Sequence, residues 1–417
     1  MNAITQPPIQ LSPGQVAAKE KVKHWLETGT NDDETYSKSV FKLQGFAGTG
    51  KTTVIRSLLS EFEGTVRFAA FTGKAAMVMR KNSLPAVTIH SLIYKPIEPD
   101  KAKCEKLFKQ IRETGDARKK DRLQKELDDT RKVKFELKPQ EESDLADADL
   151  LVLDECSMVN DEMLRDLLSY GIPILSLGDP GQLPPIEGTG ALVNGTPDAL
   201  LTEIHRQAAD NPIIDYATRA RNLIMIPYGA KGESEHKLKY EVSDDYLLQF
   251  DQVLTGKNIT RQELNRKMRA MRGFMGVYPV TGEKLICLRN DSMLGVFNGM
   301  IAEVVRVGEL YDQHIELDLR LETQLNTKFE PVRVKALRAH FESYHDKEVL
   351  KNVKWWARRD TQEFDFGYAI TVHKSQGSQW DKVLVYDDKF LVWDRKDRAR
   401  WLYTALTRAA ESVALLD

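Results

Sequence analysis

The residues best placed to do chemistry in this 417-residue sequence form a glycine-rich loop. Residues 41–52 read FKLQGFAGTGKT, which fits the spacing GxxxxGK(S/T). In such a loop the backbone amides surround phosphate oxygens at the positive end of the helix that follows. The lysine reaches the β- and γ-phosphates, and the threonine hydroxyl binds Mg²⁺. We therefore predict a nucleoside triphosphate site formed by Gly45, Gly48, Thr49, Gly50, Lys51, Thr52 and Thr53, with Thr52 also a metal ligand.

Two acidic residues end a second apolar segment. Residues 149–155 read DLLVLDE, which is typical of a buried parallel strand. We expect Asp154 to hold Mg²⁺ through water and Glu155 to polarise the water that attacks the phosphate. A third apolar run, residues 172–179, leads to Gln182, which could sense the γ-phosphate. An isolated Asp-Glu pair would be interpreted as an acidic turn, but its pairing with the phosphate loop favours hydrolysis.

Together these three segments resemble motifs of the superfamily 1 helicases, and most closely those of the superfamily 1B branch, the RecD-like and phage Dda-like helicases. The resemblance extends over almost the whole chain. It implies that ATP and Mg²⁺ are bound, and that hydrolysis drives movement along single-stranded DNA and unwinding of duplex. It also implies 5′-to-3′ movement, which the chemistry of the residues alone does not determine.

The resemblance assigns further residues to the nucleotide. LSPGQ (11–15) resembles the Q motif, in which Gln15 would pair with the adenine edge. LTEIHRQ (201–207) resembles motif IV, in which Arg206 would contact the γ-phosphate and His205 would take the place of an adenine-stacking aromatic. Arg206 could instead form a structural ion pair.

Motifs V and VI complete the expected nucleotide site. GYAITVHKSQGSQWDKV (367–383) resembles motif V, whose Gln376 and Gly377 would face the cleft between two domains. Gln379 stands where relatives often have a glutamate that is associated with the ribose. YTALTRA (403–409) resembles motif VI, in which Arg408 would be a second arginine finger that stabilises the transition-state charge.

Strand-binding residues are expected in four segments. FAAFTGKAA (68–76) and TIHSLIY (88–94) resemble motifs Ia and Ib, residues 253–269 resemble motif IVa, and motif V supplies the fourth. Small hydrogen-bonding side chains and one cation suit sugar-phosphate contacts. The same threonines and serines could cap helices, and the histidine of motif V could be an interior residue. The candidates for DNA binding are Thr72, Lys74, Thr88, His90, Ser91, Asn258, Asn265, Thr371, His373 and Ser375.

The motifs predict an α/β protein with two tandem RecA-like P-loop NTPase cores, each a parallel sheet flanked by helices. A helical, charged insertion called 1B and a small SH3-like β-barrel called 2B would interrupt them. The expected boundaries are 1–94 plus 149–200 for core 1A, 95–148 for 1B, 201–280 plus 366–417 for core 2A, and 281–365 for 2B.

The two insertions contain the least certain assignments. Residues 101–138 contain 14 Lys/Arg and 8 Asp/Glu and few large apolar residues, which predicts charged helices. They could carry a pin that splits the duplex, with Phe108 or Phe135 as candidates, or form a solvated hairpin without that role. In the second insertion, Trp355 and Trp356 could stack on bases, although a core or interface position is the favoured interpretation.

Composition limits the remaining possibilities. A formal net charge of -2 provides no whole-chain argument for nucleic acid, so binding must depend on local patches. Three widely spaced cysteines predict buried, reduced thiols. The sequence has neither an apolar run of the length of a transmembrane helix nor a recognisable secretory signal, so we predict neither membrane insertion nor export. We expect a cytoplasmic monomer of a bacterial or phage-infected cell. Its partners would be single-stranded DNA, junctions of single strand with duplex, and replication or recombination proteins.

Three alternatives remain open from the sequence. A translocase that strips proteins from single strands would use the same motifs without a pin. A nucleotide-switch binding module would not need Glu155, Gln182 and two arginine fingers together. RNA could be the track, because phosphate contacts discriminate poorly between sugars.

Overall fold

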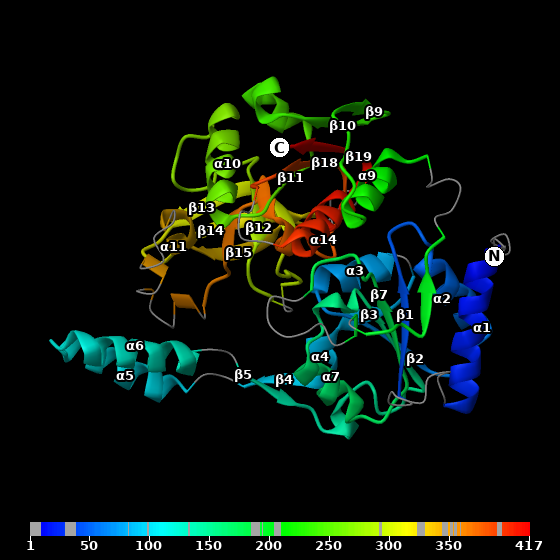
Figure 1. The fold of residues 1–417 in the computed structure, drawn as a ribbon. Coiled ribbons are helices and arrows are strands. Elements are labelled where there is room, and N and C mark those ends of the chain that lie inside the picture. Colours follow the sequence, from blue (N-terminus) through cyan, green and yellow to red (C-terminus); the bar gives the residue numbers. More distant parts are fainter. Residues whose placement is uncertain are drawn as a thin grey trace.

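A computed structural model of the chain describes residues 10–29, 39–81, 83–97, 100–131, 134–184, 192–193, 195–203, 210–291, 294–322, 330–343, 349–350, 353, 357–358, 360–389 and 394–417. The predictions for His205, Arg206, Trp355 and Trp356 lie outside the described residues. Figure 1 shows two α/β units, one above the other, with a third group of strands beside the upper unit and a helical arm projecting from the lower one.

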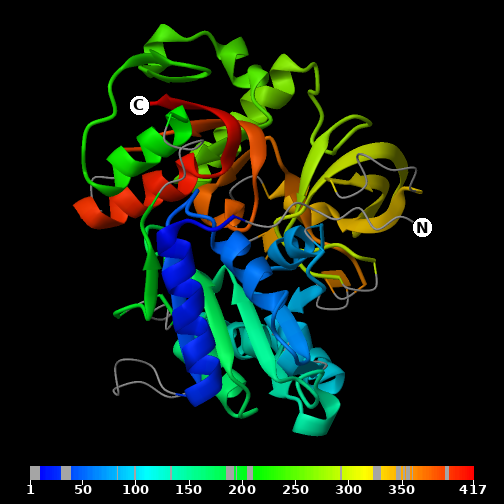
Figure 2. The ribbon, with the colours of Figure 1, turned by 90° about the vertical axis from the view of Figure 1, so that its right-hand side faces the viewer.

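The lower unit is built on a six-stranded sheet of order β3-β2-β6-β7-β1-β8, in which every pairing is parallel. Alternate residues of its strands enter two apolar clusters, since successive side chains point to opposite faces of a sheet. Leu150 and Val152 belong to one cluster, and Leu151 and Leu153 to the other. Figure 2 shows α1 running along one side of this unit. Its elements are α1 (Pro13–Thr28), β1 (Val40–Gly45), α2 (Lys51–Leu59), β2 (Val66–Ala70), α3 (Gly73–Lys81), β3 (Ala86–Thr88), α4 (Ile89–Ile93), η1 (Gln140–Glu142), β6 (Leu150–Asp154), η2 (Cys156–Met158), α7 (Asp161–Leu168), β7 (Ile174–Gly178) and β8 (Ala199–Leu201).

The upper unit has a second six-stranded sheet, of order β17-β11-β18-β19-β10-β9. Its pairings are parallel except for the hairpin of β9 and β10. Helices α9 and α14 pack against each other, and the apolar cluster that includes them also includes Phe46 and Ala47 of the phosphate loop. The elements are α9 (Pro212–Arg221), β9 (Gly229–Lys231), β10 (Ser234–Lys237), η3 (Lys239–Glu241), η4 (Asp244–Gln249), β11 (Gln252–Thr255), α10 (Asn258–Met271), β17 (Ala369–Thr371), η6 (Val372–Ser375), β18 (Trp380–Tyr386), α14 (Arg395–Leu406) and β19 (Ala409–Leu416).

A third, antiparallel sheet of order β15-β14-β13-β12-β16 lies beside the upper unit (Figure 2). Its edges approach each other at Gln362, which forms a parallel bridge with Ala336 and exchanges backbone hydrogen bonds of 2.8 Å with Lys335 and Leu337. Its elements are β12 (Lys284–Cys287), β13 (Ile301–Leu310), β14 (His314–Leu321), β15 (Val332–Leu337), α11 (Arg338–Glu342) and β16 (Phe364–Phe366).

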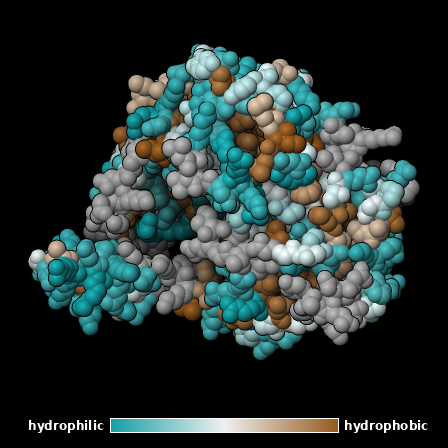
Figure 3. All heavy atoms as spheres, in the orientation of Figure 1, coloured by the Kyte–Doolittle hydropathy of each residue, from teal (hydrophilic) through white to brown (hydrophobic). Residues whose placement is uncertain are grey.

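The charged region forms an arm. Strands β4 (Tyr94–Ile97) and β5 (Lys134–Leu137) pair as an antiparallel ribbon, and α5 (Lys101–Glu113) and α6 (Ala117–Arg131) extend from it. We call the two helices the helical arm. The exposed side of the helical arm is largely hydrophilic in Figure 3. The apolar residues of this region received too little weight in the sequence analysis. The two helices share a small core formed by Cys104, Leu107, Ile111, Leu123 and Leu127.

Two predicted boundaries are displaced by one residue. Leu201 ends β8 and pairs with Gly45, so it belongs to the first sheet. Phe366 ends β16 and pairs with Leu285, so it belongs to the third sheet. The three cysteines are buried and free, as predicted. Among the described residues, we find no helix with the length and apolar character needed to span a bilayer.

Candidate active site

The phosphate loop connects β1 to α2 in the predicted manner. Gly48 and Gly50 have φ angles of 77° and 75°, which glycine adopts with less strain than other residues. A Cβ on Gly45 would lie 2.6 Å from the Thr49 hydroxyl, so only glycine fits the closed loop. The Lys51 ammonium donates hydrogen bonds of 2.6 and 3.3 Å to the carbonyls of Gly45 and Phe46. The ammonium of Lys51 therefore lies over the backbone of the loop, where the phosphates would be bound.

The two acids lie at the end of β6, beside the phosphate loop. The backbone N–H of Glu155 donates to Asp154 Oδ1 at 2.8 Å, and Glu155 has a left-handed φ of 51°. Burial raises the pKa of both carboxyls, and the charge of Lys51 acts in the opposite direction on each. The Thr52 hydroxyl and Asp154 provide oxygen donors of the type that Mg²⁺ prefers. These residues therefore fit a magnesium ion bound with a nucleotide.

Arg408 reaches this edge from the upper unit. It is 5% exposed, and it donates from Nε to the carbonyl of Thr404 at 3.1 Å and from Nη1 to that of Ser378 at 3.3 Å. Its charge is the largest influence that lowers the pKa of Glu155, against the effect of burial. The charges of Lys51 in the lower unit and Arg408 in the upper unit therefore both act on Glu155.

A tyrosine that sequence reasoning did not single out links the two units. The hydroxyl of Tyr403, on α14, accepts from the backbone N–H of Ala47 at 2.8 Å and donates to Asp179 Oδ2 at 2.7 Å. The neighbouring Thr404 hydroxyl accepts from the backbone N–H of Leu183 at 2.9 Å. Both residues lie in the quoted segment YTALTRA, but nothing in that segment indicates their partners.

Gln182 and Gln376 lie near this contact. Gln376 Nε2 donates to the carbonyl of Leu183 at 3.1 Å, which joins motif V to the loop after β7. Gln182 is 8% exposed and its Oε1 has no partner among the described residues. The predicted position of Gln376 at the junction of the two units agrees with this geometry, whereas Gln379 is exposed to solvent.

Comparisons with known proteins agree with this arrangement. Residues 33–222 match the model of an AAA domain, and residues 366–416 match that of a UvrD-like helicase C-terminal domain. The chain is similar to the ATP-dependent RecD2 DNA helicase of Deinococcus radiodurans, with 27% identity over 290 residues, 63% of this chain and 35% of that protein. These matches support a superfamily 1B helicase of the RecD-like group.

Two further relatives define the extent of the similarity. The conjugal transfer protein TraA of Agrobacterium fabrum is 26% identical over 302 residues, which cover 64% of this chain and 24% of that protein. These matches span about a third or less of the curated relatives' length. A solved structure of two coordinating Pif1 helicases at forked dsDNA has a TM-score of 0.52 and 19% identity, and covers 97% of this chain and 92% of that chain. This likeness shows that the chain has their α/β fold.

Gln15 lies beside the phosphate loop, as the prediction of a nucleotide contact requires. Its Oε1 accepts from the backbone N–H of Ser12 at 3.0 Å, and its Nε2 donates to the carbonyl of Thr49 at 3.1 Å. The first contact belongs to the capping box that begins α1. The amide thus holds α1 against the phosphate loop, and its second N–H donor and second lone pair are of the type needed to pair with an adenine edge.

Several predicted strand-binding residues lie where a strand could contact them. Motifs Ia and V meet, since a Cβ on Gly377 would lie 2.9 Å from the Thr72 hydroxyl. Thr88 caps α4 by accepting from the backbone N–H of Ser91 at 3.1 Å, so capping and strand binding remain compatible. The half-buried His90 packs against Phe135, with ring centroids 5.4 Å apart. Asn258 is exposed at the start of α10.

Burial also determines the charge of the two histidines. It lowers the pKa of both His90 and His373, so neither is a cation at neutral pH. They can offer hydrogen bonds or stacking to a strand, but not an ion pair with phosphate. Thr371 is 8% exposed, which leaves little of it for such a contact.

Three predicted DNA contacts have other roles in this structure. Lys74 is 5% exposed and pairs with Glu322 at 3.0 Å, so its charge is already neutralised. Asn265 accepts from the backbone N–H of Ala369 at 3.0 Å and donates to its carbonyl at 2.8 Å, which fastens β17 to α10. Ser375 is fully buried and donates to the carbonyl of Val372. Burial and existing partners therefore correct the prediction for these three residues.

Proposed function

We propose that the chain is an ATP-dependent DNA helicase that translocates 5′ to 3′ on single-stranded DNA and unwinds duplex. The observation that supports this most directly is that the charges of Lys51 in the lower unit and Arg408 in the upper unit both act on the buried Glu155. A binding module would not need a general base and a charge-stabilising arginine at the same place. The direction of movement rests on the superfamily 1B resemblance.

Each residue of the site has a proposed part in hydrolysis. Lys51 binds the β- and γ-phosphates, and Thr52 and Asp154 hold Mg²⁺, which neutralises phosphate charge when bound. Glu155 orients the attacking water and accepts a proton from it. Burial raises the pKa of Glu155, which makes the carboxylate a better proton acceptor. Arg408 and Arg206 stabilise charge on the transferred phosphoryl group. Gln182 senses the γ-phosphate, while Gln15, His205 and Gln379 contact the nucleoside.

Coupling to movement follows from the division of the site between two units. We propose that the lower sheet is core 1A, the upper sheet is core 2A, the helical arm with its ribbon is 1B, and the third sheet is an SH3-like barrel 2B. Because Arg408 comes from the opposite unit, hydrolysis depends on closure of the cleft between the cores. The closure of the third sheet at Gln362 supports the barrel assignment.

The strand would pass over the loops of motifs Ia, Ib, IVa and V. The contact of Gly377 with Thr72 supports a shared path, because it joins motif V of the upper unit to motif Ia of the lower one. The candidates that remain accessible are Thr72, Thr88, His90, Ser91, Asn258 and His373. We propose single-stranded DNA and its junctions with duplex as partners, and a monomer as the acting form.

Substitution of Glu155 by Gln tests the hydrolysis site. The amide is nearly the same size but cannot accept the proton of water, so turnover with poly-dT should fall by about 100-fold or more. Binding of a fluorescent ATP analogue should persist, and the exposed Glu141→Gln should behave as the unchanged chain. Undiminished hydrolysis by Glu155→Gln would remove Glu155 as the base. Failure of poly-dT to stimulate hydrolysis by the unchanged chain would count against the motor itself.

A further inference from the structure

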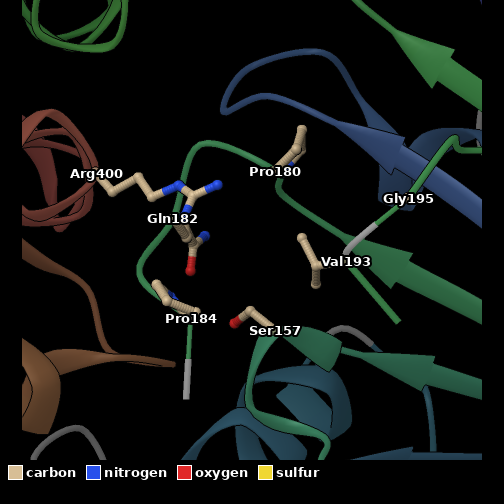
Figure 4. A pocket seen from close by; sticks show the side chains of 7 residues that line it. All are labelled: Ser157, Pro180, Gln182, Pro184, Val193, Gly195 and Arg400. Atoms are coloured by element: carbon tan, nitrogen blue, oxygen red, sulfur yellow. The ribbon is translucent and has the colours of Figure 1, made fainter. Parts of the chain in front are cut away.

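A small pocket lies where the upper unit meets the loop after β7 (Figure 4). Its volume is about 200 Å³. Pro180, Gln182 and Pro184 line it from that loop, Ser157 from η2, and Arg400 from α14. The side chains of Arg400, Gln182 and Ser157 converge on the same space in Figure 4. The pocket is therefore formed by both α/β units, on segments next to those that supply Glu155 and Tyr403.

The polar groups of this pocket lack partners. Ser157 is 3% exposed, and its Oγ has no hydrogen-bond partner among the described residues. The same holds for Oε1 of the 8% exposed Gln182. In the part of the chain that the structure describes, the Arg400 guanidinium has no hydrogen bond or ion pair, and no carboxylate lines the pocket. Buried polar groups in proteins are almost always hydrogen-bonded. Two unpaired buried groups, with the half-buried Arg400 beside them, therefore indicate a polar ligand.

The donors in the pocket select an oxyanion. Arg400 supplies a fixed charge and a planar pair of N–H donors, the arrangement that binds phosphate through two hydrogen bonds. The Ser157 hydroxyl is a further donor, and the Gln182 amide presents its NH₂ group to the pocket if it turns over. No carboxylate belongs to the described lining.

We propose that this pocket binds inorganic phosphate, the product of ATP hydrolysis, as it leaves the site. The inference rests on the proposed ATPase function. Hydrolysis would release phosphate near Glu155, and the pocket is lined by Ser157, two residues after Glu155, and by Gln182. Because Arg400 belongs to the upper unit, opening of the cleft would separate it from Ser157 and Gln182. Phosphate release would thereby be coupled to the same movement as hydrolysis.

Direct binding of phosphate tests the proposal. Inorganic phosphate is titrated by calorimetry into the full chain loaded with ADP and Mg²⁺. Arg400→Gln should weaken phosphate binding by about 10-fold, the usual effect of losing one charge-assisted contact. Phosphate should inhibit the poly-dT-stimulated ATPase of this variant correspondingly less. Arg395→Gln, an exposed position on the same helix, is the matched control and should bind phosphate as the unchanged chain does.

Other outcomes would overturn the proposal. Equal phosphate affinity in Arg400→Gln and Arg395→Gln, or no phosphate binding by the ADP-loaded chain, would remove the pocket as a phosphate site. A parallel titration with a short oligo-dT separates product from strand phosphates. If Arg400→Gln weakens oligo-dT binding and leaves phosphate binding unchanged, the pocket holds the DNA backbone instead. Calorimetry measures phosphate binding without ATP turnover. A loss of ATPase activity can therefore be distinguished from a loss of phosphate binding at this pocket.

Discussion

The hydroxyl of Tyr403 donates a hydrogen bond of 2.7 Å to Asp179, across the junction of the two α/β units. The same oxygen accepts the backbone N–H of Ala47 in the phosphate loop. Burial raises the pKa of Tyr403, so its hydroxyl remains protonated and able to donate. One side chain of the upper unit thus contacts both the loop that would bind phosphates and the loop that carries Gln182.

Tyr403→Phe should separate hydrolysis from nucleotide binding. The substitution leaves a buried carboxylate oxygen and a backbone N–H without partners, which costs about 1–3 kcal/mol. Because these groups order the site, the maximal rate of poly-dT-stimulated hydrolysis should fall by about 5- to 100-fold. The affinity for a fluorescent ATP analogue should change less. The highly exposed Tyr240→Phe is the control, and an unchanged rate in Tyr403→Phe would show that the link has no part in catalysis.

Arg408→Ala should abolish most hydrolysis while ATP still binds. An arginine that stabilises transition-state charge contributes on the order of 10³-fold to the rate. Arg408→Lys should restore little activity, because lysine lacks the planar donors. Single-turnover hydrolysis in the presence of poly-dT provides the measurement. A defect confined to ATP affinity would make Arg408 a binding residue rather than a finger.

Asn265→Ala should destabilise the fold and leave DNA contacts intact. Loss of the amide removes hydrogen bonds to the buried backbone of Ala369, so we expect a loss of about 2–3 kcal/mol in the free energy of unfolding. The exposed Asn258→Ala should show the opposite pattern, with normal stability and weaker binding of single strands. Urea denaturation and strand titration distinguish the two residues. Normal stability of Asn265→Ala would contradict its structural role.

Removal of the helical arm should separate unwinding from ATP hydrolysis. Ile97 and Lys134 pair at the end of the β4–β5 ribbon, so Asn-Gly can replace residues 98–133 as a hairpin turn. The helical arm has its own core, and poly-dT-stimulated hydrolysis should therefore retain at least about half its rate. Unwinding of a forked duplex should be lost if this insertion separates the strands. Full unwinding by the shortened chain would instead identify the arm as a solvated hairpin.

The sequence was most informative where function depends on neighbours in the chain. The phosphate loop and the strand ending at Asp154 formed as expected, because each is determined by local pattern. Contacts between segments that are distant in the sequence could not be predicted from local pattern. Tyr403 and Asp179 are 224 positions apart, and Lys74 is 248 positions from Glu322, so neither pairing leaves a local signal. The structural role of Asn265 on α10 left no local signal for the same reason, since its partner Ala369 lies 104 positions away on β17.

Unwinding of forked duplexes with either a 5′ or a 3′ single-stranded tail tests the central claim most directly. The proposed function predicts ATP-dependent strand separation of the 5′-tailed substrate, none of the 3′-tailed substrate, and no activity in Glu155→Gln. Rapid strand-stimulated hydrolysis without separation of either fork would indicate a translocase. Separation that proceeds without ATP, or equally well with Glu155→Gln, would contradict an ATP-driven helicase.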